Sequence, residues 1–147
     1  MTGVDLALLL TKDQYSFWGH FPAILLLLIP VARSPQPQPA IEAAARVVTS
    51  MNCPEGVFTL MHVGQEDSMP GFRCPEVPGW QWKKELRTGE VIQTIVDAAG
   101  DIEADLIVMS TDGRNGFLDG LRGSHSERVL RHGAAPLLTI PVGPPSE

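Results

Sequence analysis

The feature that most restricts the fold of this chain is an uninterrupted apolar run, AILLLLIPV, from Ala23 to Val31. The run is of strand length, and it is about half as long as the ~20 residues that a membrane-spanning helix needs. A strand with one face in water alternates apolar and polar residues, whereas a strand covered on both faces is apolar throughout. The run therefore predicts a central strand of a parallel sheet that carries helices on both faces.

Strand and helix patterns alternate along the rest of the chain. Apolar residues at positions i, i+3, i+4 and i+7 predict an amphipathic helix over about Pro39 to Met51 and another around Ile92 to Ala99. A short helix is predicted from Ser124 to His132. The further predicted strands are Val57 to Val63, Trp80 to Leu86, Asp105 to Met109 and Pro136 to Val142. Strands separated by helical patterns imply an α/β fold with a five-stranded, parallel, doubly wound sheet.

One long connection breaks this alternation. The segment from Gly64 to Gly79 contains three prolines and has no helical period, so it predicts a loop. The strand that follows it alternates large apolar and polar residues, which is typical of a position near the edge of a sheet. Trp80 and Trp82 fall on one face of that strand, and we interpret them as core residues rather than as a platform for stacking a base.

Charge and cysteine content argue against several classes of function. The 147 residues carry a formal net charge of -6, and their basic residues form no run that would track a nucleic acid or an anionic membrane. Cys53 and Cys74 make neither a CxxC pair nor a disulfide framework. Met1 to Leu10 has no basic residue before its apolar core and no cleavage pattern of a signal peptide. We therefore expect a cytoplasmic protein with neither nucleic acid nor membrane as a partner.

The loop before the last predicted helix has the composition of a phosphate site. Gly113 and Gly116 allow close approach of the backbone to a ligand, and Gly123-Ser124 supplies an amide and a hydroxyl at a helix start. In a doubly wound sheet, ligands bind beyond the carboxyl ends of the strands, where the strand order reverses. The same residues also have a structural interpretation. Ser124 and Glu127 fit a capping box, and Gly113 and Gly116 fit ordinary turn glycines. Neither GxGxxG nor GxxxxGK[ST] is present.

The segment from Ala104 to Val142 resembles the carboxyl-terminal signature of the universal stress protein (UspA-like) family. Nucleotide-binding members of that family carry G-x-x-G, nine residues, and then G-[ST]. Here the pattern falls on Ser110 to Gly113, then Arg114 to Arg122, then Gly123-Ser124. The resemblance extends upstream of this segment. The family's first strand with its Asp-x-Ser turn resembles AILLLLIPVARS, and its second strand resembles FTLMHV. The approach to its penultimate helix resembles LRTGEVIQTIVDAA.

This resemblance implies a Rossmann-like fold of the adenine nucleotide alpha-hydrolase type, with strand order 3-2-1-4-5. The fold would occupy residues 21–143, leaving an amino-terminal extension of unknown role at 1–20 and a tail at 144–147. The implied function is a regulatory, stress-linked module that binds ATP, alone or with Mg²⁺. Asp112 is the one evident candidate for a general base or metal ligand, so hydrolysis would be slow at most. The resemblance also implies a homodimer formed through the strand Leu137 to Val142.

The residues that the resemblance assigns to the nucleotide are Ser34, Val63, Ser110, Gly113, Arg114, Gly116, Gly123 and Ser124. The three glycines and Ser124 would hold phosphates, Ser34 and Ser110 the sugar and phosphate edge, and the Val63 backbone the base. Arg114 would neutralise phosphate or remain solvated.

Two departures from the family pattern leave a second hypothesis open. Ala32 stands where nucleotide-binding members have an Asp, and Ser110 replaces the first glycine of the loop motif. Loss of such a carboxylate removes a charge-assisted hydrogen bond that contributes roughly 1.5–3 kcal/mol. The alternative function is a dimeric protein-interaction module of the same fold that binds no nucleotide. His62, which ends the second predicted strand, has no acidic or second histidine neighbour at ligand spacing, and we interpret it as a structural residue rather than a metal ligand.

Overall fold

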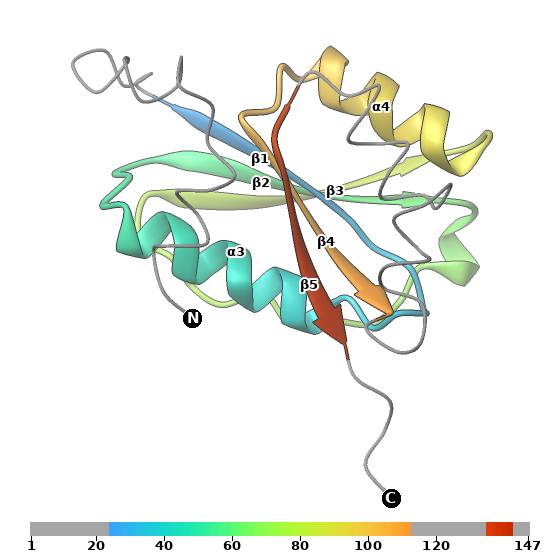
Figure 1. The fold of residues 1–147 in the computed structure, drawn as a ribbon, viewed down its shortest axis with the longest axis horizontal. Coiled ribbons are helices and arrows are strands. Elements are labelled where there is room, and N and C mark those ends of the chain that lie inside the picture. Colours follow the sequence, from blue (N-terminus) through green and yellow to red (C-terminus); the bar gives the residue numbers. More distant parts are fainter. Residues whose placement is uncertain (1–23, 113–134, 143–147) are drawn as a thin grey trace, which may run out of the picture.

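The computed structural model describes residues 24–112 and 135–142, which form five strands, two helices and one 3₁₀ turn (Figure 1). In chain order these are β1 (Leu25–Pro30), α3 (Gln38–Ser50), β2 (Gly56–Val63), η2 (Glu66–Ser68), β3 (Trp80–Arg87), α4 (Val91–Asp101), β4 (Leu106–Asp112) and β5 (Leu137–Val142). All five predicted strands and the first two predicted helices are present. The predicted helix from Ser124 to His132 lies outside the described residues.

The strands form one sheet in the order β3-β2-β1-β4-β5, and every neighbouring pair is parallel. This confirms the expected order 3-2-1-4-5. The chain moves outward from β1 to β2 and β3, and then returns to the other side of β1 to form β4 and β5. The strand order therefore reverses between β1 and β4, where the carboxyl ends of the strands leave room for a ligand.

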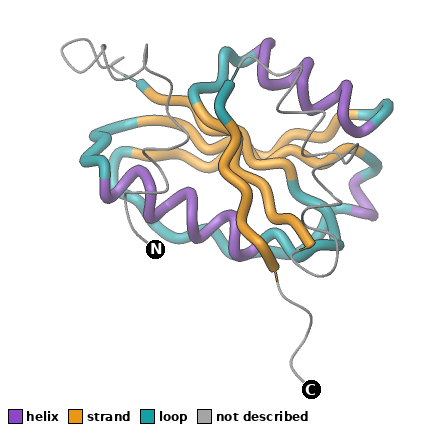
Figure 2. Tube along the Cα trace, in the orientation of Figure 1, coloured by secondary structure: helices purple, strands orange, loops and turns teal. Residues whose placement is uncertain are grey.

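Helix α3 and helix α4 cover opposite faces of this sheet (Figures 1 and 2). On the α3 face, Ile41, Ala44 and Val48 pack against alternate residues of β1, β2 and β4. On the α4 face, Ile92 and Ile95 pack against the intervening residues of the same strands. The central strands are therefore buried on both sides, as the continuous apolar run predicts.

A loop replaces the helix that usually covers the outer part of such a sheet. The segment Gly64–Gly79 joins β2 to the parallel strand β3 and contains only the short turn η2, because its prolines stop helix propagation. Its apolar residues pack against the core of the α3 face: Met69, Phe72 and Val77. Phe58 lies beneath them, with its ring centroid 4.0 Å from that of Trp82 and 4.5 Å from that of Trp80. The prediction that both tryptophans are core residues is confirmed.

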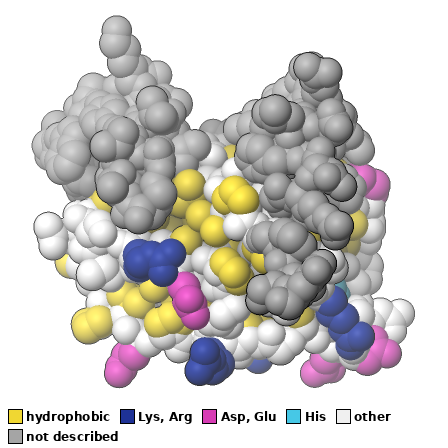
Figure 3. All heavy atoms as spheres, turned by 60° about the horizontal axis from the view of Figure 1, so that its bottom comes forward, with side chains coloured by type: hydrophobic (Ala, Val, Ile, Leu, Met, Phe, Trp, Pro, Cys, Tyr) yellow, Lys and Arg dark blue, Asp and Glu magenta, His cyan; other side chains and the backbone are white. Residues whose placement is uncertain are grey.

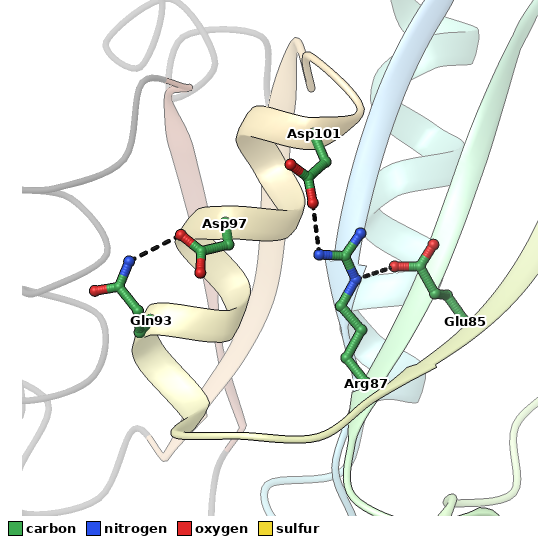
Figure 4. Close-up of polar contacts among 5 residues, drawn as sticks. All are labelled: Glu85, Arg87, Gln93, Asp97 and Asp101. Atoms are coloured by element: carbon green, nitrogen blue, oxygen red, sulfur yellow. Dashed lines mark hydrogen bonds and ion pairs between the residues drawn. The ribbon is translucent and has the colours of Figure 1, made fainter.

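Polar contacts fix helix α4 at both ends, and Figure 4 shows those at its carboxyl-terminal end, where Arg87 meets Glu85 and Asp101. At its start, the Glu90 carboxylate accepts a hydrogen bond of 2.7 Å from the Gln93 amide. At its end, Arg87 on β3 extends between two carboxylates, pairing with Glu85 and, at 2.8 Å, with Asp101. The arginine thus links the edge strand to the last turn of the helix. Among residues 24–112 and 135–142, no helix has the length and apolar character needed to cross a membrane.

Candidate functional site

A pocket of about 140 Å³ lies at the carboxyl ends of β1, β2 and β4, where the strand order reverses. Its lining consists of Pro30, Val31, Ala32, Ser34, Pro35, Pro37, Met61, His62, Val63, Val91, Ile95, Met109 and Ser110. The connection from β1 into α3 forms one wall, and the first turns of α4 form another. The pocket therefore occupies the position that the topology of the sheet reserves for a ligand.

Three of the residues selected from the sequence line this pocket together: Ser34, Val63 and Ser110. They come from three different segments, and the parallel sheet brings them to one edge. Ala32, at the position where the family pattern has a carboxylate, lines the same pocket. The remaining selected residues lie outside the described residues: Gly113, Arg114, Gly116, Gly123 and Ser124.

The described lining of the pocket carries no Asp, Glu, Lys or Arg side chain. Its polar side chains are Ser34, which is exposed, His62 and Ser110. The Ser110 hydroxyl oxygen is buried and has no hydrogen-bond partner in the described part of the chain, and the same holds for the next hydroxyl on β4, that of Thr111. An unsatisfied buried hydroxyl costs about 1–3 kcal/mol. A hydrogen-bonding atom of a ligand in the pocket would remove that cost at Ser110.

His62 joins the wall of the pocket to the loop that follows β2. Its side chain is buried, with Nδ1 2.9 Å from the carbonyl oxygen of Val31 and Nε2 2.7 Å from Oγ of Ser68. These contacts fit the structural role expected for a histidine at a strand end. Within the described ranges, no group of His, Cys, Asp and Glu is arranged to hold a metal ion. No pattern in the sequence distinguishes Ser68, which stands among several other polar loop residues.

Further hydrogen bonds fasten the loop beside the start of α3. The Arg33 guanidinium donates to the carbonyl oxygen of Asp67 at 2.8 Å. The Gln38 side chain donates to the Arg73 carbonyl oxygen at 3.0 Å and accepts from the Arg73 amide at 2.9 Å. The loop and the connection that lines the pocket are therefore bound to each other directly.

Asp105, an acidic residue with a shifted pKa, lies at the edge of the sheet opposite the pocket. Asp105 precedes β4, and burial raises the pKa of its carboxyl group even though one oxygen accepts a hydrogen bond of 2.8 Å from the Leu26 amide. Burial likewise raises the pKa of the Cys53 thiol, and Asp105 adds to this effect. We interpret both groups as structural, because they lie away from the carboxyl ends of the strands.

The surface of the described residues carries no continuous basic area on the face in Figure 3, where Lys and Arg side chains stand apart from one another. Hydrophobic side chains gather nearer the centre of that face. A protein that binds a nucleic-acid backbone usually concentrates basic residues along one surface. This face does not have that arrangement.

The model of the universal stress protein family matches residues 75–141. A universal stress protein of Methanocaldococcus jannaschii is 28% identical over 138 residues, covering 94% of this chain and 76% of that protein. This alignment extends over the first two strands, which the family match does not include.

Two solved structures share the fold. The universal stress protein UspA from Lactobacillus plantarum has a TM-score of 0.58 and 20% identity, covering 79% of this chain and 97% of that one. A universal stress protein family protein from Arabidopsis thaliana with AMP bound has a TM-score of 0.54 and 14% identity, covering 80% of this chain and 90% of that one. The motif, the family match over residues 75–141, the archaeal relative and the sheet order agree that the chain resembles the universal stress protein family.

Proposed function

We propose that this protein is a regulatory module that binds an adenine nucleotide, ATP, in the pocket beyond β1, β2 and β4. The observation that carries the proposal is the convergence of Ser34, Val63 and Ser110 on one pocket at the point where the strand order reverses. The unpartnered Ser110 hydroxyl adds a group that a sugar or phosphate oxygen would satisfy. The AMP bound to the Arabidopsis thaliana protein of the same fold supports the choice of ligand class.

The pocket itself would hold the nucleoside end of the nucleotide. Its volume of about 140 Å³ is below the roughly 300–1,000 Å³ of pockets for drug-sized ligands, so it fits part of an ATP molecule. The Val63 backbone would contact the base, and Ser34 and Ser110 the sugar and the nearest phosphate. The phosphate contacts proposed for Gly113, Arg114, Gly116, Gly123 and Ser124 rest on the sequence motif.

The proposed role is binding rather than turnover, in the cytoplasm and as a homodimer. None of the residues assigned to the nucleotide is a carboxylate, so the assigned set includes no carboxylate general base. The dimer would form through β5, an edge strand whose Leu138 and Ile140 remain partly exposed and which pairs only with β4 in the described chain.

The second candidate is a dimeric protein-interaction module without a nucleotide. The specific observation in its favour is Ala32 in a pocket whose described lining has no charged side chain. Without a carboxylate, the sugar hydroxyls lose a charge-assisted partner.

Calorimetric titration of the full-length protein with ATP and Mg²⁺ distinguishes these two candidates. We expect heat of binding and a rise in Tm with ATP, and neither with GTP at the same concentration. Absence of both signals at millimolar ATP would refute nucleotide binding. Gly123→Val is expected to abolish the signal while the far-UV circular dichroism stays unchanged, because a side chain at this motif glycine would obstruct the close approach of phosphate that the motif implies. Binding by this variant with wild-type affinity would refute the phosphate assignment.

A further inference from the structure

One wall of the pocket is formed by the connection from β1 to α3, and its side chains are almost entirely apolar. Its residues in the lining are Val31, Ala32, Ser34, Pro35 and Pro37. All residues of this connection belong to the described part of the chain. Proline has no amide hydrogen, and the side chains of alanine and valine neither donate nor accept hydrogen bonds. Ser34 therefore supplies the polar side chain of this wall.

The depth of each residue in the pocket indicates which part of a nucleotide it would meet. Met61 is fully buried, and Val31 and His62 are 4% and 7% exposed, so these residues form the floor. Ala32 and Ser34 are exposed and lie at the mouth. In a nucleotide the sugar joins the flat base to the charged phosphates, which are costly to bury. With the base on the floor, the sugar therefore lies beside Ala32 and Ser34.

Ribose presents two neighbouring hydroxyl groups, at its 2′ and 3′ carbons, and this wall offers a side-chain partner to one of them. The 2′ carbon is bonded to the carbon that carries the base, so it lies nearer the floor than the 3′ carbon does. Ala32 directly follows the floor residue Val31, whereas Ser34 lies two residues farther along the chain. The Ser34 hydroxyl therefore faces the 3′ side, and the 2′ side meets the methyl group of Ala32.

The charged residue of this connection serves the loop rather than the pocket. Arg33 is not among the lining residues, and its guanidinium donates to the Asp67 carbonyl oxygen at 2.8 Å. In other doubly wound nucleotide sites, an acidic residue binds the 2′-hydroxyl of the ribose, or a nearby arginine accommodates a 2′-phosphate. The side chains of this wall that line the pocket include neither kind of group.

We propose that Ala32 leaves the 2′ position of the sugar without a side-chain partner, so that the ligands of this pocket include 2′-deoxyadenosine nucleotides as well as adenosine nucleotides. This selectivity rests on the proposed nucleotide function, to which it adds the residue that sets the preference between the two sugars. A carboxylate at position 32 would accept a hydrogen bond from the 2′-hydroxyl, and that bond exists only with ribose. The methyl group of alanine makes no such distinction.

Calorimetric titration of the full-length protein with ATP and with dATP, both with Mg²⁺, tests the sugar selectivity. We expect the two Kd values of the wild type to agree within about threefold, because a charged group that bound the 2′-hydroxyl would separate them by about tenfold or more. A preference of the wild type for ATP by about tenfold or more would overturn the proposal.

Ala32→Asp tests whether this wall contacts the sugar. Because Ala32 is exposed, the larger side chain should leave the circular dichroism unchanged. We expect this variant to bind ATP about tenfold or more tightly than dATP. The ratio of the two Kd values is the measured quantity, because repulsion between the new carboxylate and the phosphates acts on both nucleotides alike. Ala32→Asn, which adds an uncharged acceptor of similar size, should give a smaller ratio.

Gln36→Asp is the matched control, because Gln36 is an exposed residue of the same connection that does not line the pocket. This variant adds the same charge and should keep the wild-type ratio of Kd values. An unchanged ratio in Ala32→Asp, or an equal rise in Gln36→Asp, would overturn the placement of the sugar beside Ala32.

The wild type and the two aspartate variants together distinguish failure of the sugar selectivity from failure of the proposed function. A wild type that binds ATP but not dATP would support nucleotide binding and overturn the sugar selectivity. A wild type that binds neither nucleotide would refute the proposed function, and with it the ligand class. Ala32→Asp then decides the placement of the sugar: binding of ATP by this variant but not by Gln36→Asp would support it, and absence of binding would overturn it.

Discussion

Replacement of Ser110 by alanine should change stability and affinity in opposite directions. The Ser110 hydroxyl oxygen is buried without a partner in the described chain, and alanine removes that oxygen alone. An unsatisfied hydroxyl costs about 1–3 kcal/mol, and we take the lower end because the residue as a whole retains some exposed surface. The free energy of unfolding of the ligand-free protein should therefore rise by about 1 kcal/mol, which raises Tm by roughly 3–4 °C.

The same change should weaken ATP binding. If a ligand atom satisfies the Ser110 hydroxyl, the variant loses one hydrogen bond of about 1 kcal/mol, and Kd should increase roughly fivefold. Thr111→Val is the matched control, because the Thr111 hydroxyl is also buried without a partner in the described chain but Thr111 does not line the pocket. That variant should gain stability and keep its ATP affinity.

Denaturant unfolding of the ligand-free proteins and calorimetric titration with ATP measure the two effects. A Ser110→Ala protein that is less stable than the wild type would refute the account of an unsatisfied hydroxyl. Unchanged ATP affinity in this variant would remove Ser110 from the binding site. If Thr111→Val also weakened ATP binding, the loss in Ser110→Ala could no longer be assigned to contact within the pocket.

Three other changes test the packing and electrostatics of the fold. Gly79→Ala should lower the free energy of unfolding by about 2 kcal/mol or more in chemical denaturation, because the added Cβ would lie 2.0 Å from the Pro54 carbonyl oxygen and the residue has φ +84°. Gly71→Ala is the control: Gly71 has open space around it, so this variant should stay within about 0.5 kcal/mol of the wild type. Arg87→Ala should cost about 0.5–1 kcal/mol, and a loss that did not shrink between 0.05 and 0.5 M NaCl would contradict an ion-pair origin. Burial raises the pKa of the Asp105 carboxyl group, so folding favours its protonated form. The stability that this preference contributes is full below about pH 4 and is lost as pH rises through the folded-state pKa. Asp105→Asn should therefore gain stability relative to the wild type between pH 4 and pH 7, and an equal difference at both values would contradict this reasoning.

Periodicity predicted the strands because a strand buried on both faces is apolar whatever its neighbours are. It predicted their ends less well. β4 continues to Asp112, three residues beyond the predicted end at Met109, since Ser110 and Thr111 still pair with Ile140 and Pro141 of β5. Polar side chains at the carboxyl end of a strand carry no hydrophobic signal, although the backbone ladder continues through them. The residues that reach the pocket are among those that this signal misses.

The convergence of the site residues was predictable from topology, whereas their contacts with the loop were not. Any chain that folds into this sheet brings the ends of β1, β2 and β4 together, so the motif and the strand order were sufficient for Ser34, Val63 and Ser110. The contact between His62 and Ser68 depends on the path of an irregular loop, and the sequence of that loop has no hydrophobic periodicity from which the path could be predicted. The path is fixed by tertiary contacts between residues distant in sequence, such as Arg33 and Asp67.

The loop that replaces a helix creates the coupling between that loop and the site. A helix satisfies most of its backbone groups internally, but an irregular segment must find partners for them elsewhere. Here Arg33 donates to the Asp67 carbonyl oxygen, and Trp82 donates to the Pro75 carbonyl oxygen at 2.8 Å. The Gln38 side chain donates to the Arg73 carbonyl oxygen and accepts from the Arg73 amide. Two of these partners belong to the connection from β1 through the first turn of α3, other residues of which line the pocket. We therefore expect a ligand that orders this connection to order the loop as well, because the two segments share the hydrogen bonds of Arg33 and Gln38.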